Sequence, residues 1–141
     1  MPNEPARTVV DTGPLVALFD AADAHHARVM TFLRASRSQF VSTTAVVTEA
    51  MYVLEPSRTA RRNLLTWIKD GGLELVEVEA NDLGRVIELM DKYADLPMDF
   101  TDAVLVALCE RLDTKHVATV DRDFEIYRYR GREKFINVLF E

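Results

Sequence analysis

The sequence has few of the features that would place it in a membrane, outside the cell or around zinc. Its 141 residues contain one cysteine, Cys109, and no apolar run that approaches the ~20 residues needed to span a bilayer. One cysteine excludes an internal disulfide and cannot by itself build a thiolate metal site. Residues 1–7 lack the apolar segment of a signal peptide, so we expect a cytoplasmic protein.

Positive charge is also in deficit. The chain has 17 Lys and Arg residues against 23 Asp and Glu residues, which gives a formal net charge of −6. A protein with this balance does not coat nucleic acid non-specifically. A nuclease remains compatible with it, because acids that cluster around a metal ion leave the rest of the surface less acidic. The length predicts one domain over residues 1–141, large enough to bury a substantial core.

Strand-like and helix-like segments alternate along the chain, without repeats or low-complexity linkers. Short apolar or alternating segments predict strands at residues 7–11, 40–42, 73–78, 115–120 and 135–140. Helical patterns lie between them, at residues 15–21, 24–35, 44–54, 58–69, 82–93 and 100–109. This order predicts an α/β fold in which helices cover both faces of a central parallel sheet of four to five strands. In such sheets functional groups gather beyond the carboxyl ends of the strands.

The segment 97–109 places two carboxylates at the start of an otherwise apolar helix. Asp99 follows a proline and a methionine, Asp102 comes three residues later, and residues 103–109 present no polar face. A helix that is apolar all round belongs in a core, so Asp102 is expected to enter the interior and to need a partner. The structural alternative is a capping pair, with Asp99 as N-cap and Asp102 answering it.

Other acids also stand in apolar surroundings. Asp11 ends the first predicted strand, and Glu49 is the only charged residue among residues 41–54. Asp121 ends the fourth predicted strand, and Asp123 follows two positions later. Each has a structural alternative: a helix cap for Asp11, a turn for Asp121 and a solvated helix face for Glu49. We prefer Asp121 to Asp123 because it directly ends its strand.

Taken together, the acids predict a site for a divalent cation. Carboxylates brought together without a counter-charge repel one another, and some must take up protons. Mg²⁺ or Mn²⁺ relieves this, since both ions bind a few carboxylates and keep water in their remaining positions. Water bound to such an ion is more readily deprotonated and can attack a phosphodiester. An acidic cluster without a set of histidines or cysteines therefore favours phosphodiester cleavage over zinc chemistry.

Four segments of the chain resemble, in order and in spacing, the four acidic motifs of PIN domains. The sequence is particularly similar to the VapC-type toxins of prokaryotic toxin–antitoxin pairs. The segments are DTGPLVAL at residues 11–18, TEA at 48–50, MDFTDA at 98–103 and TVDRDF at 119–124. From the first segment to the last, the resemblance extends over nearly the whole chain.

This resemblance implies a PIN-like three-layer α/β/α sandwich and a Mg²⁺- or Mn²⁺-dependent endoribonuclease. It also implies RNA as substrate, a homodimer, and a protein antitoxin as partner. Carried over by position, the catalytic and metal-binding acids would be Asp11, Glu49, Asp102 and Asp121. Asp11 and Asp102 would be the firmest ligands. Secondary candidates are Asp99, Asp123, Thr12 and Thr119, the two threonines as hydroxyl partners of water or metal.

A region rich in arginine, residues 122–134, follows the last motif. It is interpreted either as ordinary surface charge or as a rim that follows the RNA phosphates, with Tyr127 or Tyr129 stacking on a base. Outside catalysis, the alternative function is a metal-free PIN-like module that binds RNA or protein. An aspartic protease, suggested by Asp-Thr-Gly at residues 11–13, would need far more β-structure than this helical chain provides.

Overall fold

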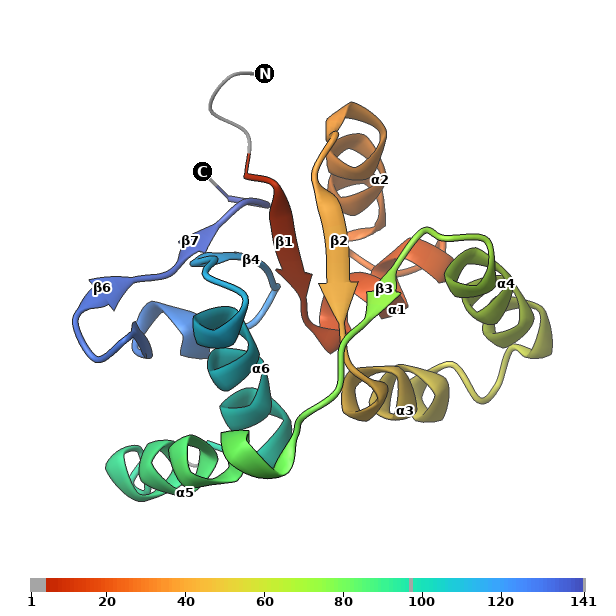
Figure 1. The fold of residues 1–141 in the computed structure, drawn as a ribbon. Coiled ribbons are helices and arrows are strands. Elements are labelled where there is room, and N and C mark those ends of the chain that lie inside the picture. The colour runs from red at the N-terminus through yellow and green to blue at the C-terminus, as the bar shows by residue number, and fades with distance from the viewer. Residues whose placement is uncertain (1–4, 97, 141) are drawn as a thin grey trace.

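A twisted sheet of parallel strands runs through the centre of the computed structural model, which describes residues 5–96 and 98–140 (Figure 1). Within those residues the sheet has five strands in the order β3-β2-β1-β4-β7, and every neighbouring pair is parallel. The strands are β1 (Arg7–Val10), β2 (Gln39–Ser42), β3 (Glu74–Leu75), β4 (His116–Ala118) and β7 (Ile136–Asn137). The predicted α/β fold with a parallel sheet is confirmed.

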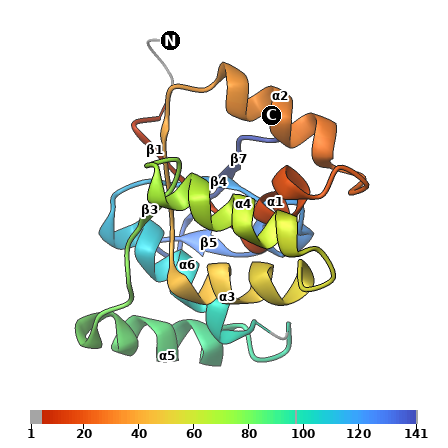
Figure 2. The ribbon, with the colours of Figure 1, turned by 90° about the vertical axis from the view of Figure 1, so that its right-hand side faces the viewer.

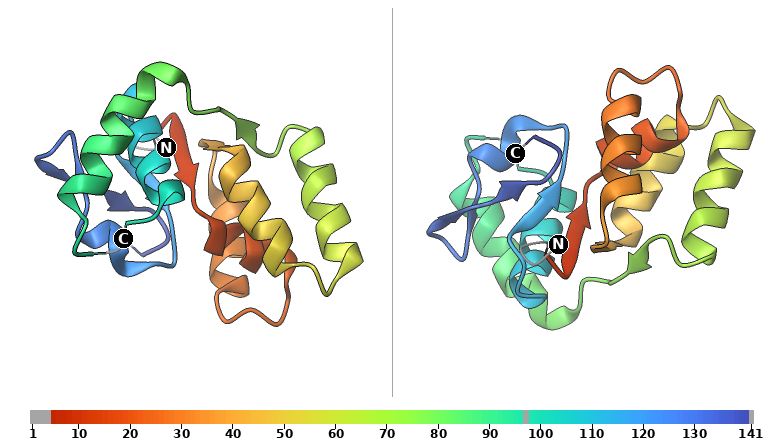
Figure 3. Two further views of the ribbon diagram at one scale, coloured as in Figure 1. Left: turned by 90° about the horizontal axis from the view of Figure 1, so that it is seen from below. Right: turned by 90° about the horizontal axis from the view of Figure 1, so that it is seen from above.

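Six α-helices within the described residues flank this sheet. They are α1 (Thr12–Phe19), α2 (His26–Ala35), α3 (Thr44–Val53), α4 (Arg58–Lys69), α5 (Leu83–Lys92) and α6 (Phe100–Arg111). Helix α1 contacts α2, α3 and α4, whereas α5 packs on α6. The two groups lie on opposite sides of the sheet (Figure 3), and α4 lies in front of it between α2 and α3 in Figure 2. No helix in the described ranges is long and apolar enough to cross a bilayer.

The strand order reverses beside β1. From β1 the chain continues to β2 and β3 on one side and later returns to β4 and β7 on the other. Val9 of β1 is in register with Val41 of β2 and with Val117 of β4. Parallel sheets leave a crevice beyond the carboxyl ends of the strands at such a switch point. The crevice between β1 and β4 is therefore the position at which this fold places a site.

Helix α6 is the main apolar element of the core, as its sequence predicts. All residues from Ala103 to Cys109 are buried, and Val104, Leu105, Val106 and Leu108 are at most 1% exposed. Burial of each such aliphatic side chain contributes roughly 1.5–3 kcal/mol. Asp99 caps the helix, since its side chain accepts a hydrogen bond from the backbone N–H of Asp102 at 2.8 Å. The start of α6 is thereby fixed beside the switch point.

Several predicted boundaries were wrong, and two of them have a clear local cause. Helix α1 begins at Thr12, three residues earlier than expected, because the Asp11 carboxylate caps it and Pro14 fits in a first helical turn. The strand predicted at residues 73–78 is only two residues long. Beyond it the Glu77 carboxylate accepts a 2.7 Å hydrogen bond from the Thr44 N–H and so caps α3 instead. Strands β4 and β7 are also shorter than predicted.

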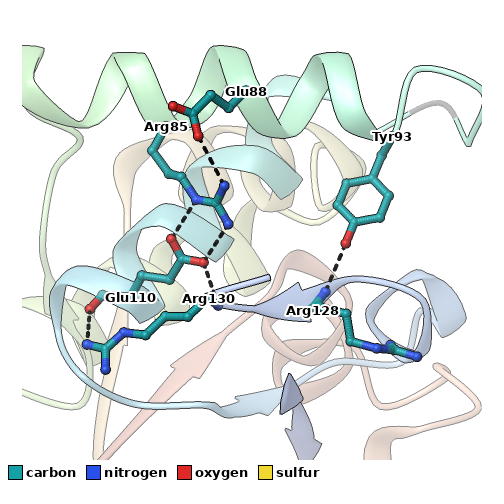
Figure 4. Close-up of polar contacts among 6 residues, drawn as sticks. All are labelled: Arg85, Glu88, Tyr93, Glu110, Arg128 and Arg130. Carbon is teal, nitrogen blue, oxygen red and sulfur yellow. Dashed lines mark hydrogen bonds and ion pairs between the residues drawn. The ribbon is translucent and has the colours of Figure 1, made fainter. Parts of the chain in front are cut away.

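A short antiparallel hairpin follows β4, and the sequence did not predict it. Strands β5 (Arg128–Tyr129) and β6 (Glu133–Lys134) pair across a turn in which Arg130 and Gly131 both have positive φ, 51° and 75°. Glu110 of α6 holds this turn through the Arg130 N–H at 2.8 Å, and it also binds Arg85 of α5 (Figure 4). One carboxylate thus ties the hairpin and α5 to α6.

Candidate active site

A cleft of about 610 Å³ opens at the carboxyl edge of β1 and β4. Its lining is mostly acidic, and it consists of Asp11, Thr12, Gly13, Glu49, Asp99, Asp102, Val120, Asp121, Arg122 and Asp123. The acids come from the ends of β1 and β4, from α3, and from the start of α6. All four carboxylates of the motif quartet therefore face one cleft. Within the described part of the chain, however, no three acidic, histidine or cysteine side chains form a ready-made site for an ion.

Asp11 is the most deeply buried of these acids, at 9% exposure. Its Oδ1 accepts a hydrogen bond from the Thr12 N–H at 2.8 Å, and its Oδ2 accepts one from the Thr119 hydroxyl at 2.9 Å. The pKa of Asp11 is raised to about 6, chiefly by burial and in smaller part by the charges of Asp121 and Glu49, while these hydrogen bonds act to lower it. The capping alternative holds for Asp11, but its carboxylate also stands in the acidic cleft.

Glu49 lies half-buried on α3, with each carboxylate oxygen held by a different hydroxyl. Oε2 accepts a hydrogen bond from the Thr12 hydroxyl at 2.9 Å, and Oε1 accepts one from the Thr101 hydroxyl at 2.7 Å. These bonds join α3 to the starts of α1 and α6. The carboxylate of Glu49 is thus held by two hydroxyl groups and is not free in solvent, although Thr48 and Tyr52 beside it on α3 are exposed, as the solvated-face alternative expected.

Asp102 stands in the first turn of α6 and is half-buried. Its Oδ2 accepts a hydrogen bond from the hydroxyl of Tyr127 at 2.9 Å. The pKa of Asp102 is raised to about 7, chiefly by burial and then by the charge of Asp99, while the hydrogen bond from Tyr127 acts to lower it. Asp99 caps α6, as the capping alternative predicted, and it also lines the cleft.

The fourth motif brings two acids to the cleft. Asp121 is exposed, and its Oδ1 accepts a hydrogen bond from the Asp123 N–H at 3.0 Å, as an acid in a turn does. Burial, followed by the charge of Asp121, raises the pKa of Asp123. The end of β4 can approach α1 closely because residue 13 is glycine: a Cβ there would lie 2.3 Å from Cγ2 of Val120.

The donors around the acids are neutral, and this decides what the cleft can bind. Threonine and tyrosine hydroxyls hold Asp11, Glu49 and Asp102, and among the described residues that line the cleft Arg122 is the one cation. Hydroxyl donors orient carboxylates without cancelling their charge. A set of oxygen ligands with excess negative charge fits a hard divalent cation such as Mg²⁺ or Mn²⁺. Such an ion would relieve the repulsion that helps to raise the pKa of Asp11 and Asp102.

The aromatic part of the basic region does not face solvent. Tyr127 is 1% exposed and Tyr129 4% exposed, so the prediction that either stacks on a base was wrong. The guanidinium of Arg128 donates to three backbone carbonyls of residues 125–127, and that of Arg130 pairs with Asp113. These arginines stabilise their own segment.

The sequence did not assign two residues to the role they have in holding the acids. Thr101 lies between the two aspartates of the third motif, and only the packing of α3 against α6 shows that it faces Glu49. Tyr127 was assigned to the surface, whereas its hydroxyl reaches Asp102 from the core. A polar residue beside a motif acid, at the start of an apolar helix, is the one sequence signal that could have indicated Thr101.

An α/β domain with an acidic cleft at its switch point is the class that this geometry defines, and comparison with known proteins gives the family. A family model described as PIN domain matches residues 8–129. Ribonuclease VapC26 of Mycobacterium tuberculosis is 30% identical over 130 residues, which cover 90% of this chain and 96% of that protein. The chain therefore belongs to the PIN-domain family.

Solved structures with the same fold include toxins of this kind. The crystal structure of M. tuberculosis VapC20, described as a sarcin–ricin loop cleaving toxin, has a TM-score of 0.77 at 19% identity and covers 84% of this chain and 93% of that one. A toxin–antitoxin complex from Klebsiella pneumoniae has a TM-score of 0.64 at 16% identity, covering 82% and 87%. VapBC2 from Rickettsia felis, bound to a promoter DNA fragment, has a TM-score of 0.61 at 11% identity and covers 85% of this chain and 92% of that one. These likenesses confirm the predicted PIN-like fold.

Proposed function

We propose that this chain is a metal-dependent endoribonuclease, the toxin of a toxin–antitoxin pair. The observation that carries the proposal is the cleft shared by Asp11, Glu49, Asp102 and Asp121, in a chain 30% identical to Ribonuclease VapC26 over 90% of its length. We assign the catalytic and metal-binding roles to these four acids. We further propose a cytoplasmic protein in which residues 1–141 form a single domain.

The cation would be Mg²⁺ or Mn²⁺, held chiefly by Asp11 and Asp102 with Glu49 and Asp121 assisting. When bound, it supplies an acidified water molecule and offsets charge on the phosphoryl oxygens. The chain's own contribution is orientation. Hydroxyl groups fix Asp11, Glu49 and Asp102, and Arg122 at the same cleft supplies positive charge for an RNA phosphate.

The experiment that tests this function is a cleavage assay on labelled RNA with Mg²⁺, with Mn²⁺ and with EDTA. We expect cleavage with either ion, loss of cleavage in EDTA, and recovery when Mn²⁺ is added in excess, because the acids cannot position an attacking water without an ion. Absence of cleavage in Mn²⁺, with RNA or protein binding retained, would favour the metal-free binding module.

The proposed partners are RNA, a protein antitoxin and a second copy of the chain. Two of the solved structures with the same fold are toxin–antitoxin assemblies. Large apolar side chains are exposed on α3 and α5, including Tyr52 at 82%, Val53 at 54% and Ile87 at 61%. Exposed apolar surfaces of this kind are typical of protein interfaces. An antitoxin reading frame beside the gene would support the toxin role.

Replacement of Thr101 by valine is expected to lower RNA cleavage by about 10- to 100-fold, as is usual for residues that orient metal ligands. Valine keeps the shape of the 7%-exposed side chain but removes the hydroxyl that donates to Glu49 Oε1. The measurement is kcat/KM of the purified variant. Thr101→Ser, which restores a hydroxyl, is the matched control and should recover most of the loss. Equal activity of Thr101→Val and wild type would contradict the prediction.

A further inference from the structure

The Tyr127 hydroxyl reaches Asp102 from the protein core. Tyr127 is 1% exposed and is not among the residues that line the acidic cleft. Its hydroxyl nevertheless donates to Asp102 Oδ2 at 2.9 Å. The hydroxyl group of this buried side chain therefore binds one carboxylate oxygen of an acid in the cleft.

The ring of Tyr127 is fixed by its aromatic neighbours. The Tyr93 ring lies 5.0 Å away between centroids at an interplanar angle of 60°, and the Phe124 ring lies 5.2 Å away at 75°. Tilted and edge-on arrangements of this kind are favourable. Tyr93 is itself held, because its hydroxyl accepts a hydrogen bond from the Arg128 N–H at 3.1 Å (Figure 4). The hydroxyl of Tyr127 is consequently presented from a rigid position.

The orientation of the Asp102 carboxylate is not fixed by the helix and depends on a hydrogen-bond donor such as Tyr127. The terminal torsion of an aspartate is broad, so rotamer preference alone does not decide where its two oxygens point. Within residues 5–96 and 98–140, Oδ2 accepts the tyrosine hydrogen bond, whereas Oδ1 accepts none. The hydrogen bond thus selects one orientation and leaves an oxygen available for an ion.

The chemistry of the donor matters as well. A lysine or arginine in this place would orient the carboxylate but would also cancel the charge that attracts a cation. A buried phenol donates a hydrogen bond and stays neutral, and burial raises the pKa of Tyr127 above its usual range. Asp11 and Glu49 are held on the same principle, by the hydroxyls of Thr119, Thr12 and Thr101.

We propose that Tyr127 is a positioning residue that holds the Asp102 carboxylate in the orientation in which it binds the divalent ion. The inference rests on the proposed function, since it assumes that Asp102 is a metal ligand. It assigns to the segment after β4 a role in metal affinity, in place of the base-stacking role predicted from the sequence. The aromatic neighbours Tyr93 and Phe124 act only by fixing the ring.

The test compares Tyr127→Phe with Tyr93→Phe in Mn²⁺ titrations of the purified protein by calorimetry, without RNA. Each change removes one hydroxyl from the same aromatic cluster, but only Tyr127 donates to an acid of the cleft. We expect Tyr127→Phe to weaken Mn²⁺ binding by about 10- to 100-fold, and Tyr93→Phe to leave it near the wild-type value. Melting curves in EDTA report the purely structural cost of each change.

Three results would overturn the inference. The first is unchanged Mn²⁺ affinity in Tyr127→Phe. The second is an equal loss of affinity in both variants, which would mean that general packing is responsible. The third is a loss of the same size when Tyr127→Phe is added to Asp102→Ala, because alanine leaves no acceptor for the Tyr127 hydroxyl and a residue that acts through Asp102 then has nothing to act on. Failure of the proposed function is distinguishable, since the wild-type protein would then bind no Mn²⁺ and cleave no RNA.

Discussion

Asp11→Asn and Asp102→Asn are each expected to lower RNA cleavage roughly a thousandfold, a loss of about 4 kcal/mol of transition-state stabilisation. An amide has the size of a carboxylate but no charge, and Mg²⁺ and Mn²⁺ bind anionic oxygens far better than neutral ones. Both side chains lie in the cleft and are held by hydroxyl groups. Neither change removes apolar packing, so the fold is expected to remain. The measurement is kcat/KM on a defined RNA, with circular dichroism to verify folding.

The matched control for these variants is Asp91→Asn. Asp91 is an exposed residue of α5 and is absent from the lining of the cleft, so the same change of charge there should leave cleavage unaltered. Asp99→Asn is informative for a different reason, because asparagine caps helices as well as aspartate does. A loss of cleavage in Asp99→Asn would then report the carboxylate itself. Near-wild-type cleavage by both Asp11→Asn and Asp102→Asn would refute the assignment of the site.

Stability is expected to depend on pH in the direction set by Asp11. In the folded, metal-free protein the pKa of Asp11 is raised from 3.8 to about 6. Between these two values the unfolded chain releases the proton and the folded chain keeps it, so the free energy of unfolding falls as pH rises. The contribution of protonated Asp11 to the free energy of unfolding is fully present below about pH 4 and is lost as the pH rises to about 6 and above. Asp102, with a pKa of about 7, acts in the same direction at somewhat higher pH.

The size of this effect follows from the shift at Asp11, which is 9% exposed. A difference of about two pKa units corresponds to up to about 3 kcal/mol. Asp11→Asn should therefore unfold with about the same free energy as wild type near pH 4 and with up to about 3 kcal/mol more near pH 7. The amide can keep the bond from the Thr12 N–H, and the Thr119 hydroxyl can reverse its role to accept.

Urea unfolding in EDTA at several pH values measures the free energy of unfolding of both proteins. Subtracting the wild-type value from that of Asp11→Asn removes the contribution of groups that titrate equally in both. Saturating Mn²⁺ supplies a second check. An ion that binds only the deprotonated carboxylates stabilises the folded wild type increasingly as pH rises. In Asp11→Asn the slope in EDTA should lose the contribution of Asp11 and keep that of Asp102, and the opposite slope in Mn²⁺ should become small because a main ligand of the ion is gone. A wild type that gains stability in EDTA relative to Asp11→Asn between pH 4 and 7 would disprove the account.

Local sequence predicted much of this fold because its cues are short-range. The apolar run of residues 103–109 can only be a core helix, and Ser57 marks the start of α4, where its side chain accepts the Ala60 N–H at 3.1 Å. The β5–β6 hairpin was missed because its strands are two residues long and partly charged. Its turn also places Arg130 at positive φ, a conformation that Glu110 stabilises from a distant helix.

By itself, the sequence determined that acids end β1 and β4 and begin α6, and the alternation of strands and helices placed them at one edge of a parallel sheet. That much follows from local periodicity and from the geometry of parallel strands. Only the tertiary structure decided which hydroxyl holds which carboxylate oxygen and that Tyr127 is buried behind Asp102. Such pairs join residues 25 to 108 positions apart, so they depend on how whole elements pack and not on any local pattern.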